Sequence, residues 1–126
     1  MKVLLESSAI IEYLKGNKRA KEVLDNAEDF YVSSLSAYEI LLGKVDESKI
    51  LDFLSAFKVL SVTLKDSVIA SRIYKRLKDK GMLIGSSFDI LIAAQAINRD
   101  LTLVTKDTDF LRIKGEYENL KLLMLS

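Results

Sequence analysis

Short apolar runs alternate with amphipathic stretches along the whole chain. The apolar runs have the length and composition of strands that are buried on both faces of a sheet. The stretches between them carry apolar residues at intervals of three and four, which is the spacing of a helix with one buried face. We therefore predict strands at residues 1–5, 30–35, 58–64, 101–105 and 120–125, and helices at residues 9–15, 35–42, 48–57 and 86–100.

Polar residues at the ends of these stretches predict where helices begin and end. Ser7 or Ser8 is a good N-cap for the first helix, and Gly16 with Asn17 forms a stop signal that a short polar helix follows. Thr63 and Asp66 have the spacing of a capping box, which predicts a long helix reaching about residue 79 before Lys80 and Gly81.

Strands that alternate with helices predict an α/β fold with three layers, α/β/α, around a central and mainly parallel sheet of five strands. Crossover helices are needed because neighbouring parallel strands cannot be joined by a tight hairpin. No linker, repeat or low-complexity tract interrupts the pattern, so we expect residues 1–126 to form a single domain.

Composition narrows the possible chemistry. The chain has 19 basic and 18 acidic residues, and its net charge of +1 provides no overall field that would attract nucleic acid or a membrane surface. It contains no Cys and no His, which excludes disulfides, thiolate or imidazole metal sites and all nucleophile–His schemes. The beginning of the chain does not resemble a signal peptide, and no apolar run approaches the ~20 residues that span a bilayer, so we expect a cytoplasmic protein.

Four acids map to one edge of the predicted sheet. Glu6 ends the first strand, Glu39 lies in the first turns of a helix, Asp89 lies in the first turn of the most apolar helix, and Asp107 follows the fourth strand. Parallel strands bring their carboxyl ends to one edge, where the neighbouring helices have their N-termini. Crowded carboxylates repel one another, and a hard divalent cation such as Mg²⁺ or Mn²⁺ relieves this repulsion using only oxygen ligands.

Each acid also has a purely structural interpretation. Glu39 and Asp89 follow Ser36 and Ser86 at capping-box spacing, as Asp66 follows Thr63, where no functional role is expected. Asp107 and Asp109 are typical turn residues, and Glu6 is compatible with a solvated strand end. The functional interpretation therefore depends on the convergence of all four acids and not on any one of them.

Three segments carry a family resemblance. The stretches "LLESSAIIEYL", "SSLSAYEILLG" and "SFDILIAAQAINRDLTLVTKDTDF" together resemble the PIN-domain ribonucleases, most closely the VapC-like toxins of toxin–antitoxin pairs. This resemblance implies a three-layer fold whose acidic cluster binds magnesium or manganese and cleaves RNA. Residue by residue, it implies that Glu6, Glu39, Asp89 and Asp107 are catalytic acids that hold the metal, with Asp109 as a further contributor. Ser8 and Thr105 match hydroxyl positions that orient the acids.

One departure from the family pattern concerns the first acid. The family usually has Leu-Asp-Thr-Ser at the end of the first strand, whereas this chain has Leu5, Glu6, Ser7 and Ser8. Glu6 keeps the charge but lengthens the side chain by one methylene, and Mg²⁺ tolerates little distortion of its octahedral geometry. An alternative hypothesis is therefore a catalytically weakened PIN domain that binds RNA or a protein partner without efficient cleavage.

The leading hypothesis is metal-assisted hydrolysis of RNA, which needs neither His nor Cys. Lys15, Lys44 and Lys106 are loose candidates for holding the RNA backbone, although ordinary surface solvation is the favoured explanation for each of them. The resemblance implies a small antitoxin partner whose C-terminal segment fills the active-site groove, and a homodimer. No membrane partner is expected.

A receiver-like phosphoacceptor domain also gathers acids at a sheet edge. It requires an acidic pair after the first strand and an aspartate that ends the third. Here Ser7 and Ser8 follow the first strand, and Val62 and Thr63 end the third, so this alternative fits the sequence poorly.

Overall fold

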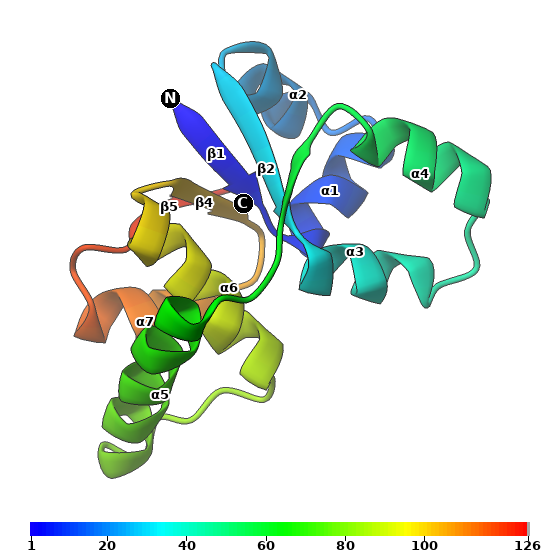
Figure 1. The fold of residues 1–126 in the computed structure, drawn as a ribbon. Coiled ribbons are helices and arrows are strands. Elements are labelled where there is room, and N and C mark those ends of the chain that lie inside the picture. Colours follow the sequence, from blue (N-terminus) through cyan, green and yellow to red (C-terminus); the bar gives the residue numbers. More distant parts are fainter. Residues whose placement is uncertain (126) are drawn as a thin grey trace.

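The protein is a five-stranded parallel sheet with helices on both faces, as seen in a computed structural model that describes residues 1–125 (Figure 1). The strand order is β3-β2-β1-β4-β5, and all four neighbouring pairs are parallel, which confirms the predicted α/β class. The strands are β1 (Lys2–Leu5), β2 (Asp29–Ser33), β3 (Lys58–Leu60), β4 (Thr102–Thr105) and β5 (Lys121–Met124).

Seven helices are found within residues 1–125. Six of them correspond to the predicted helices, with ends shifted by a few residues. The helix that the sequence pattern missed is the last one, which directly follows the β4 acids. The helices are α1 (Ser7–Leu14), α2 (Lys18–Asp25), α3 (Ser34–Leu41), α4 (Glu47–Leu54), α5 (Leu64–Asp79), α6 (Ser87–Arg99) and α7 (Asp109–Glu116).

Two apolar cores lie on opposite faces of the sheet. Leu4 and Leu103 belong to the core under α5, α6 and α7, whereas Val3, Leu5 and Val104 belong to the core under α1, α2, α3 and α4. This division follows from the alternation of side chains along each strand, because successive residues point to opposite faces. The strands read as continuous apolar runs because both faces are covered.

The third strand is shorter than the predicted range of residues 58–64. Its last residue, Leu60, pairs with Ser33, which is also the last residue of β2. β3 lies at the edge of the sheet, so once β2 ends it has no neighbouring backbone to bond. The chain then leaves the sheet and reaches α5 through Thr63, whose side chain accepts the N–H of Asp66 at 3.1 Å in the predicted capping box.

The chain changes direction across the sheet at β1. It builds β2 and β3 on one side of β1 and then crosses to place β4 on the other side (Figure 1). In open parallel sheets, such a switch leaves a crevice at the carboxyl ends of the two central strands, where ligands commonly bind. Both Glu6 and Thr105 lie at this crevice, since they stand at the carboxyl ends of β1 and β4.

No helix in the described part of the chain combines the length and the apolar character that a membrane span requires.

Candidate active site

Glu6 connects the first strand to the first helix and is buried, with 4% of its surface exposed. Its backbone N–H donates to Val104 at 3.0 Å, which continues the pairing of β1 with β4. Its carboxylate accepts the N–H of Ser8 at 3.1 Å, so Glu6 itself is the N-cap of α1. The prediction of a serine N-cap is therefore wrong, and the alternative interpretation of Glu6 as a solvated strand end is excluded. The carboxylate, with its extra methylene, folds back onto the helix it precedes.

Three hydroxyl groups hold the Glu6 carboxylate. Oε1 accepts from Thr105 Oγ1 at 2.6 Å and from Ser8 Oγ, and Oε2 accepts from Ser7 Oγ at 2.7 Å. Ser7 and Ser8 begin α1 whereas Thr105 ends β4, so the carboxylate of Glu6 is held from both the helix it precedes and the neighbouring central strand.

Thr105 and Ser8 also hold the loop that follows β4. Thr105 Oγ1 accepts the N–H of Asp107 at 3.0 Å, and Ser8 Oγ accepts the N–H of Lys106 at 2.9 Å. The two hydroxyls that the sequence identified as orienting groups thus join the Glu6 carboxylate to the backbone that carries Asp107. Their contacts fit a positioning role.

Three aspartates form the compact part of the site. Asp89, Asp107 and Asp109 each place one carboxylate oxygen so that these atoms lie within 4.8 Å of one another. They come from the start of α6, the loop after β4 and the start of α7. Asp107 also uses Oδ1 to accept the N–H of Asp109 at 2.9 Å, so its turn-forming role and its place in the cluster coexist.

Asp89 is in the least favourable environment for a charge. It is 6% exposed, and no hydrogen bond to its carboxylate is found among residues 1–125. Burial raises the pKa of Asp89 to about 7, and the negative charges of Glu6, Asp107, Glu39 and Asp109 act in the same direction. The carboxyl group is thus half protonated near neutral pH unless a cation is present.

Glu39 lies beside this cluster on α3. Its Oε1 lies 3.4 Å from Ser7 Oγ, whose single proton is shared between Glu39 and the closer Glu6 carboxylate. Burial raises the pKa of Glu39, with a further rise from the charge of Glu6 and a smaller opposing effect of the Ser7 hydrogen bond. The four acids predicted to converge therefore do so, together with Asp109.

Two of the predicted capping boxes are absent. α3 begins at Ser34 with Ser33 as its N-cap, so Ser36 lies inside the helix and its buried hydroxyl has no partner within residues 1–125. At α6, Ser86 accepts the N–H of Phe88 at 3.2 Å, but the reciprocal bond from Asp89 is not made. Both Glu39 and Asp89 therefore remain available for the site.

No lysine or arginine in the described chain forms an ion pair with any of these five acids. Lys106, one of the three predicted RNA-binding cations, instead pairs with Glu12 on α1. Lys15 lines a neighbouring apolar groove with Glu39, and Lys44 forms no ion pair among these residues.

The residues present fit a hard divalent cation. The cluster offers only oxygen donors, its oxygens are close enough to share one ion, and the raised pKa of Asp89 signals charge that nothing in the described protein compensates. Asp89, Asp107 and Asp109 are the closest set of ligands, with Glu6 and Glu39 adjoining them. Asp109 was expected only as a further contributor, and the sequence pattern did not predict α7, which positions it. The spacing of Phe110 and Ile113 was the available signal.

Comparisons with known proteins agree with this geometry. A family model described as the PIN domain matches residues 3–116. Ribonuclease VapC1 of Methanocaldococcus jannaschii is 34% identical over 124 residues, which cover 95% of this chain and 82% of the relative.

Solved structures show the same fold. A chain from the crystal structure of VapBC2 from Rickettsia felis, bound to a DNA fragment from its promoter, is 25% identical, with a TM-score of 0.78 and 98% of both chains covered. A chain from the crystal structure of FitAcB from Neisseria gonorrhoeae is 26% identical, with a TM-score of 0.78, and the match covers 98% of this chain and 97% of that one.

Proposed function

Because the chain belongs to the PIN-domain family, we propose that it is a divalent-metal-dependent endoribonuclease and the toxin of a toxin–antitoxin pair. The observation that carries this proposal is the convergence of Asp89, Asp107 and Asp109 with no compensating cation in the described chain. The identity to a ribonuclease named VapC1 supports RNA as the substrate.

In this proposal, the acids at the sheet edge have different roles. Asp89, Asp107 and Asp109 hold Mg²⁺ or Mn²⁺, with Glu6 and Glu39 contributing charge and orienting a water. When bound, the cation supplies an activated water and neutralises charge that develops on the leaving oxygen of the phosphodiester. Ser8 and Thr105 keep Glu6 and the Asp107 loop at a fixed separation. Such a reaction requires the acids to be held in precise positions relative to one another.

The test is cleavage of a labelled single-stranded RNA by purified protein with MnCl₂ or MgCl₂. Wild type should cut with either ion and lose activity in EDTA, and Asp89→Asn should be inactive. Asp79→Asn is a matched control, because it removes the same charge from an exposed residue of α5. Equal cleavage by wild type and Asp89→Asn would refute a metal-dependent nuclease at this site and reveal a contaminating ribonuclease.

A second candidate function is an RNA- or protein-binding PIN domain with weakened catalysis. The favouring observation is that Glu6 Oε1 already accepts three hydrogen bonds, which reduces its capacity to coordinate an ion. If this candidate is correct, wild type should bind RNA without cutting it, and Glu6→Asp should restore cleavage. Full wild-type activity that Glu6→Asp does not increase would exclude it.

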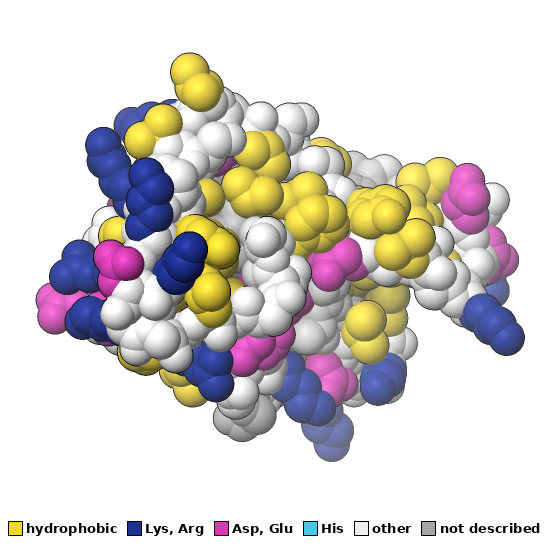
Figure 2. Space-filling model, turned by 90° about the horizontal axis from the view of Figure 1, so that it is seen from below, with side chains coloured by type: hydrophobic (Ala, Val, Ile, Leu, Met, Phe, Trp, Pro, Cys, Tyr) yellow, Lys and Arg dark blue, Asp and Glu magenta, His cyan; other side chains and the backbone are white. Residues whose placement is uncertain are grey.

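For the antitoxin, we propose a groove that adjoins the acids. Ile11, Leu14, Ile40 and Val45 line this groove of about 390 Å³, and Glu39 lies on its rim. Figure 2, which views the molecule from below, shows apolar side chains in a band next to acidic side chains. Exposed apolar bands of this kind commonly mark protein interfaces. A segment with large apolar residues and one basic residue near Glu39 would complement the groove.

Co-purification with the product of the neighbouring reading frame tests the partner, since Leu14→Glu should release it whereas the exposed Leu111→Glu on α7 should not. The proposed homodimer is tested separately by light scattering during size-exclusion chromatography. A monomer at micromolar concentration would exclude a stable dimer.

A further inference from the structure

Basic residues are concentrated on α5. Residues 64–80 hold six of the 19 basic residues but only two of the 18 acids, although the chain as a whole is nearly neutral. One of these acids, Asp66, is fully buried and paired with Arg99, so it does not offset the surface charge. Figure 2 shows Lys and Arg side chains gathered on the left, the side where α5 and α7 lie in Figure 1.

Three of these cations share one face of the helix and have no ion-pair partner in the described chain. Lys65, Arg72 and Lys75 are exposed, and their spacings of seven and three residues align them along α5. Arg76 and Lys80 lie nearby and share the single carboxylate of Glu116, at 3.4 Å and 2.7 Å, so positive charge remains in excess there too.

The basic face borders a groove of about 320 Å³ with features suited to a nucleotide. Lys65 and Arg72 stand on its α5 side, and the Tyr117 ring and Asn119 stand opposite. Ile69 and Ile97 add apolar surface, and the guanidinium of Arg76 lies over the Tyr117 ring at 5.7 Å. Cations beside an aromatic ring are the combination that binds single-stranded nucleic acid, because phosphates pair with the cations and bases stack on the ring.

The basic face also runs alongside the helix that carries the acidic site. Asp66 on α5 pairs with Arg99 on α6, and these two helices form an antiparallel hairpin (Figure 1). Lys65 and Lys75 are ten residues apart on α5, and Arg76 contacts Glu116 and Tyr117 at the end of α7, whereas Asp109 of the acidic cluster begins that helix. The basic face thus extends about 15 Å along the hairpin, which is the length of roughly two or three nucleotides of an extended strand.

We propose that this face is an RNA exosite, which binds a part of the substrate strand outside the acidic cluster. The proposal rests on the ribonuclease function proposed above and adds the surface that holds the substrate. The acidic cluster repels phosphates that no cation bridges, so flanking phosphates need a basic surface elsewhere. The two larger grooves are less suited. One is lined by Tyr13, Phe30 and Phe53 together with Asp25 and Asp52 and, among the described residues, by no Lys or Arg. The other is the apolar groove that we propose for the antitoxin.

The experiment measures RNA binding by fluorescence anisotropy in EDTA, in an Asp89→Asn background that prevents cleavage. The probe is a fluorescein-labelled single-stranded RNA of about 15 nucleotides, within the range that one such surface binds. The exosite variant is Lys65→Gln/Arg72→Gln/Lys75→Gln. The matched control is Lys18→Gln/Arg19→Gln/Lys21→Gln, which removes the same charge from α2 on the opposite face of the sheet.

The exosite variant should raise Kd at least about tenfold and reduce the slope of log K against log salt by about 2, whereas the α2 control should change neither. Lys65→Arg/Arg72→Lys/Lys75→Arg should retain binding, and Tyr117→Leu should weaken it several-fold without changing the slope. Equal loss in both triple variants, or no loss in either, would overturn the exosite, as would a wild type that binds no RNA.

The two proposals fail separately. Cleavage of an RNA of about four nucleotides, short enough for the acidic site alone, tests the nuclease and should be equal in wild type and in the exosite variant with Asp89 intact. Retained cleavage with unchanged long-RNA binding would overturn the exosite and leave the nuclease standing. Unchanged cleavage in Asp89→Asn would overturn the nuclease whatever the binding result.

Discussion

Two aspartates occupy the same local position and have opposite properties. Asp66 is the third residue of α5 and Asp89 is the third residue of α6, and each follows a hydroxyl residue that caps its helix. Both are buried, with 0% and 6% of their surfaces exposed. Burial alone would raise the pKa of both, yet the pKa of Asp66 is lowered to about 2 and that of Asp89 is raised to about 7.

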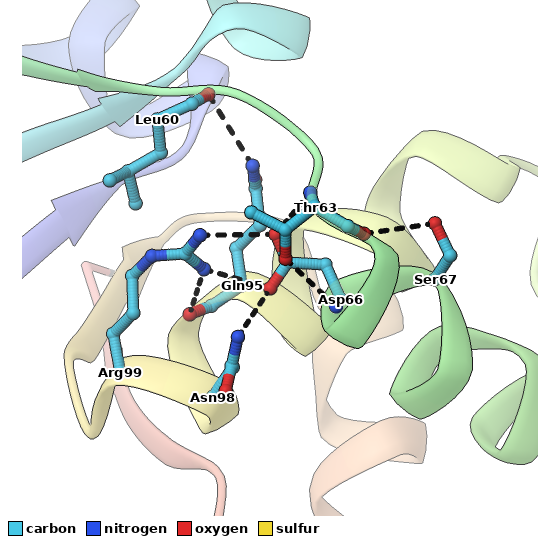
Figure 3. Close-up of polar contacts among 7 residues, drawn as sticks. All are labelled: Leu60, Thr63, Asp66, Ser67, Gln95, Asn98 and Arg99. Atoms are coloured by element: carbon cyan, nitrogen blue, oxygen red, sulfur yellow. Dashed lines mark hydrogen bonds and ion pairs between the residues drawn. The ribbon is translucent and has the colours of Figure 1, made fainter.

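The difference comes from their partners. The effect of burial on Asp66 is outweighed by two hydrogen bonds from Arg99, at 2.8 Å and 3.1 Å, and by donors from Thr63 and Asn98, both at 2.9 Å (Figure 3). Asp89 faces four other acids instead. The hydrogen-bonded Asp66 joins α5 to α6 and has no free carboxylate oxygen for a ligand. Asp89 is repelled by its acidic neighbours, and a bound cation can relieve this repulsion.

The largest expected effect of substituting these two aspartates is on the rate of RNA cleavage. Asp89→Asn removes a proposed metal ligand and should reduce RNA cleavage at least about 100-fold, since even groups that only orient metal ligands contribute 10–100-fold. Asp66→Asn should cleave at close to the wild-type rate when assayed at a temperature where it is folded. Similar losses in both folded variants would show that Asp66 belongs to the reaction machinery.

For the free energy of unfolding, the substitution at Asp66 should be the damaging one and the substitution at Asp89 should not. Asp66→Asn leaves the Arg99 guanidinium without its counter-ion at a largely buried site and should lower the free energy of unfolding by roughly 3 kcal/mol at pH 7. Urea unfolding followed by circular dichroism measures this, because the chain has no Trp. Since the pKa of Asp66 is lowered from 3.8, the loss should be complete above pH 4 and shrink as pH falls towards 2. A constant loss across this range would contradict the ion pair as its cause.

Asp89→Asn should make the metal-free protein more stable. The folded pKa of Asp89 lies above its ordinary value of 3.8, so its protonated form stabilises the fold at low pH and this contribution is lost as pH rises through 7. In EDTA at pH 8, the variant should exceed wild type by roughly 1–3 kcal/mol, and the two should converge near pH 4. Adding Mn²⁺ should raise the melting temperature of wild type but not of the variant. A variant that is less stable at pH 8 would argue against uncompensated charge at Asp89.

The smallest effects are expected for the two threonines that hold these regions. Thr63→Val removes the helix cap beside Asp66 and should cost about 1 kcal/mol of stability without changing cleavage. Thr105→Val removes the donor to Glu6 and the acceptor for the Asp107 N–H, and should lower cleavage by about tenfold. Parallel melting curves and cleavage rates separate the two outcomes, and a Thr105→Val enzyme with full activity would remove Thr105 from the positioning network.

The sequence by itself determined the layers, the strands and the edge to which the acids go. These properties follow from the spacing of apolar residues, which is local, and from the direction that parallel strands share. The absence of His and Cys likewise fixed oxygen as the only type of side-chain metal ligand, because it is a property of composition.

Only the tertiary structure decided which partners each acid has and which acids form the cluster. The same serine or threonine spacing gave a capping box at Asp66 but none at Glu39, because α3 begins at Ser34 and leaves Ser36 inside the helix. At Asp89 the carboxylate does not accept the Ser86 N–H, so no box forms there either. Glu6 caps α1 by accepting the N–H of Ser8, and its carboxylate is also held by Thr105, which lies 99 residues away along the chain. Asp109 joined the cluster because α7 begins there. The charge state of a buried acid depends on neighbours that folding brings together, and these neighbours cannot be predicted from the residues adjacent to it in the sequence.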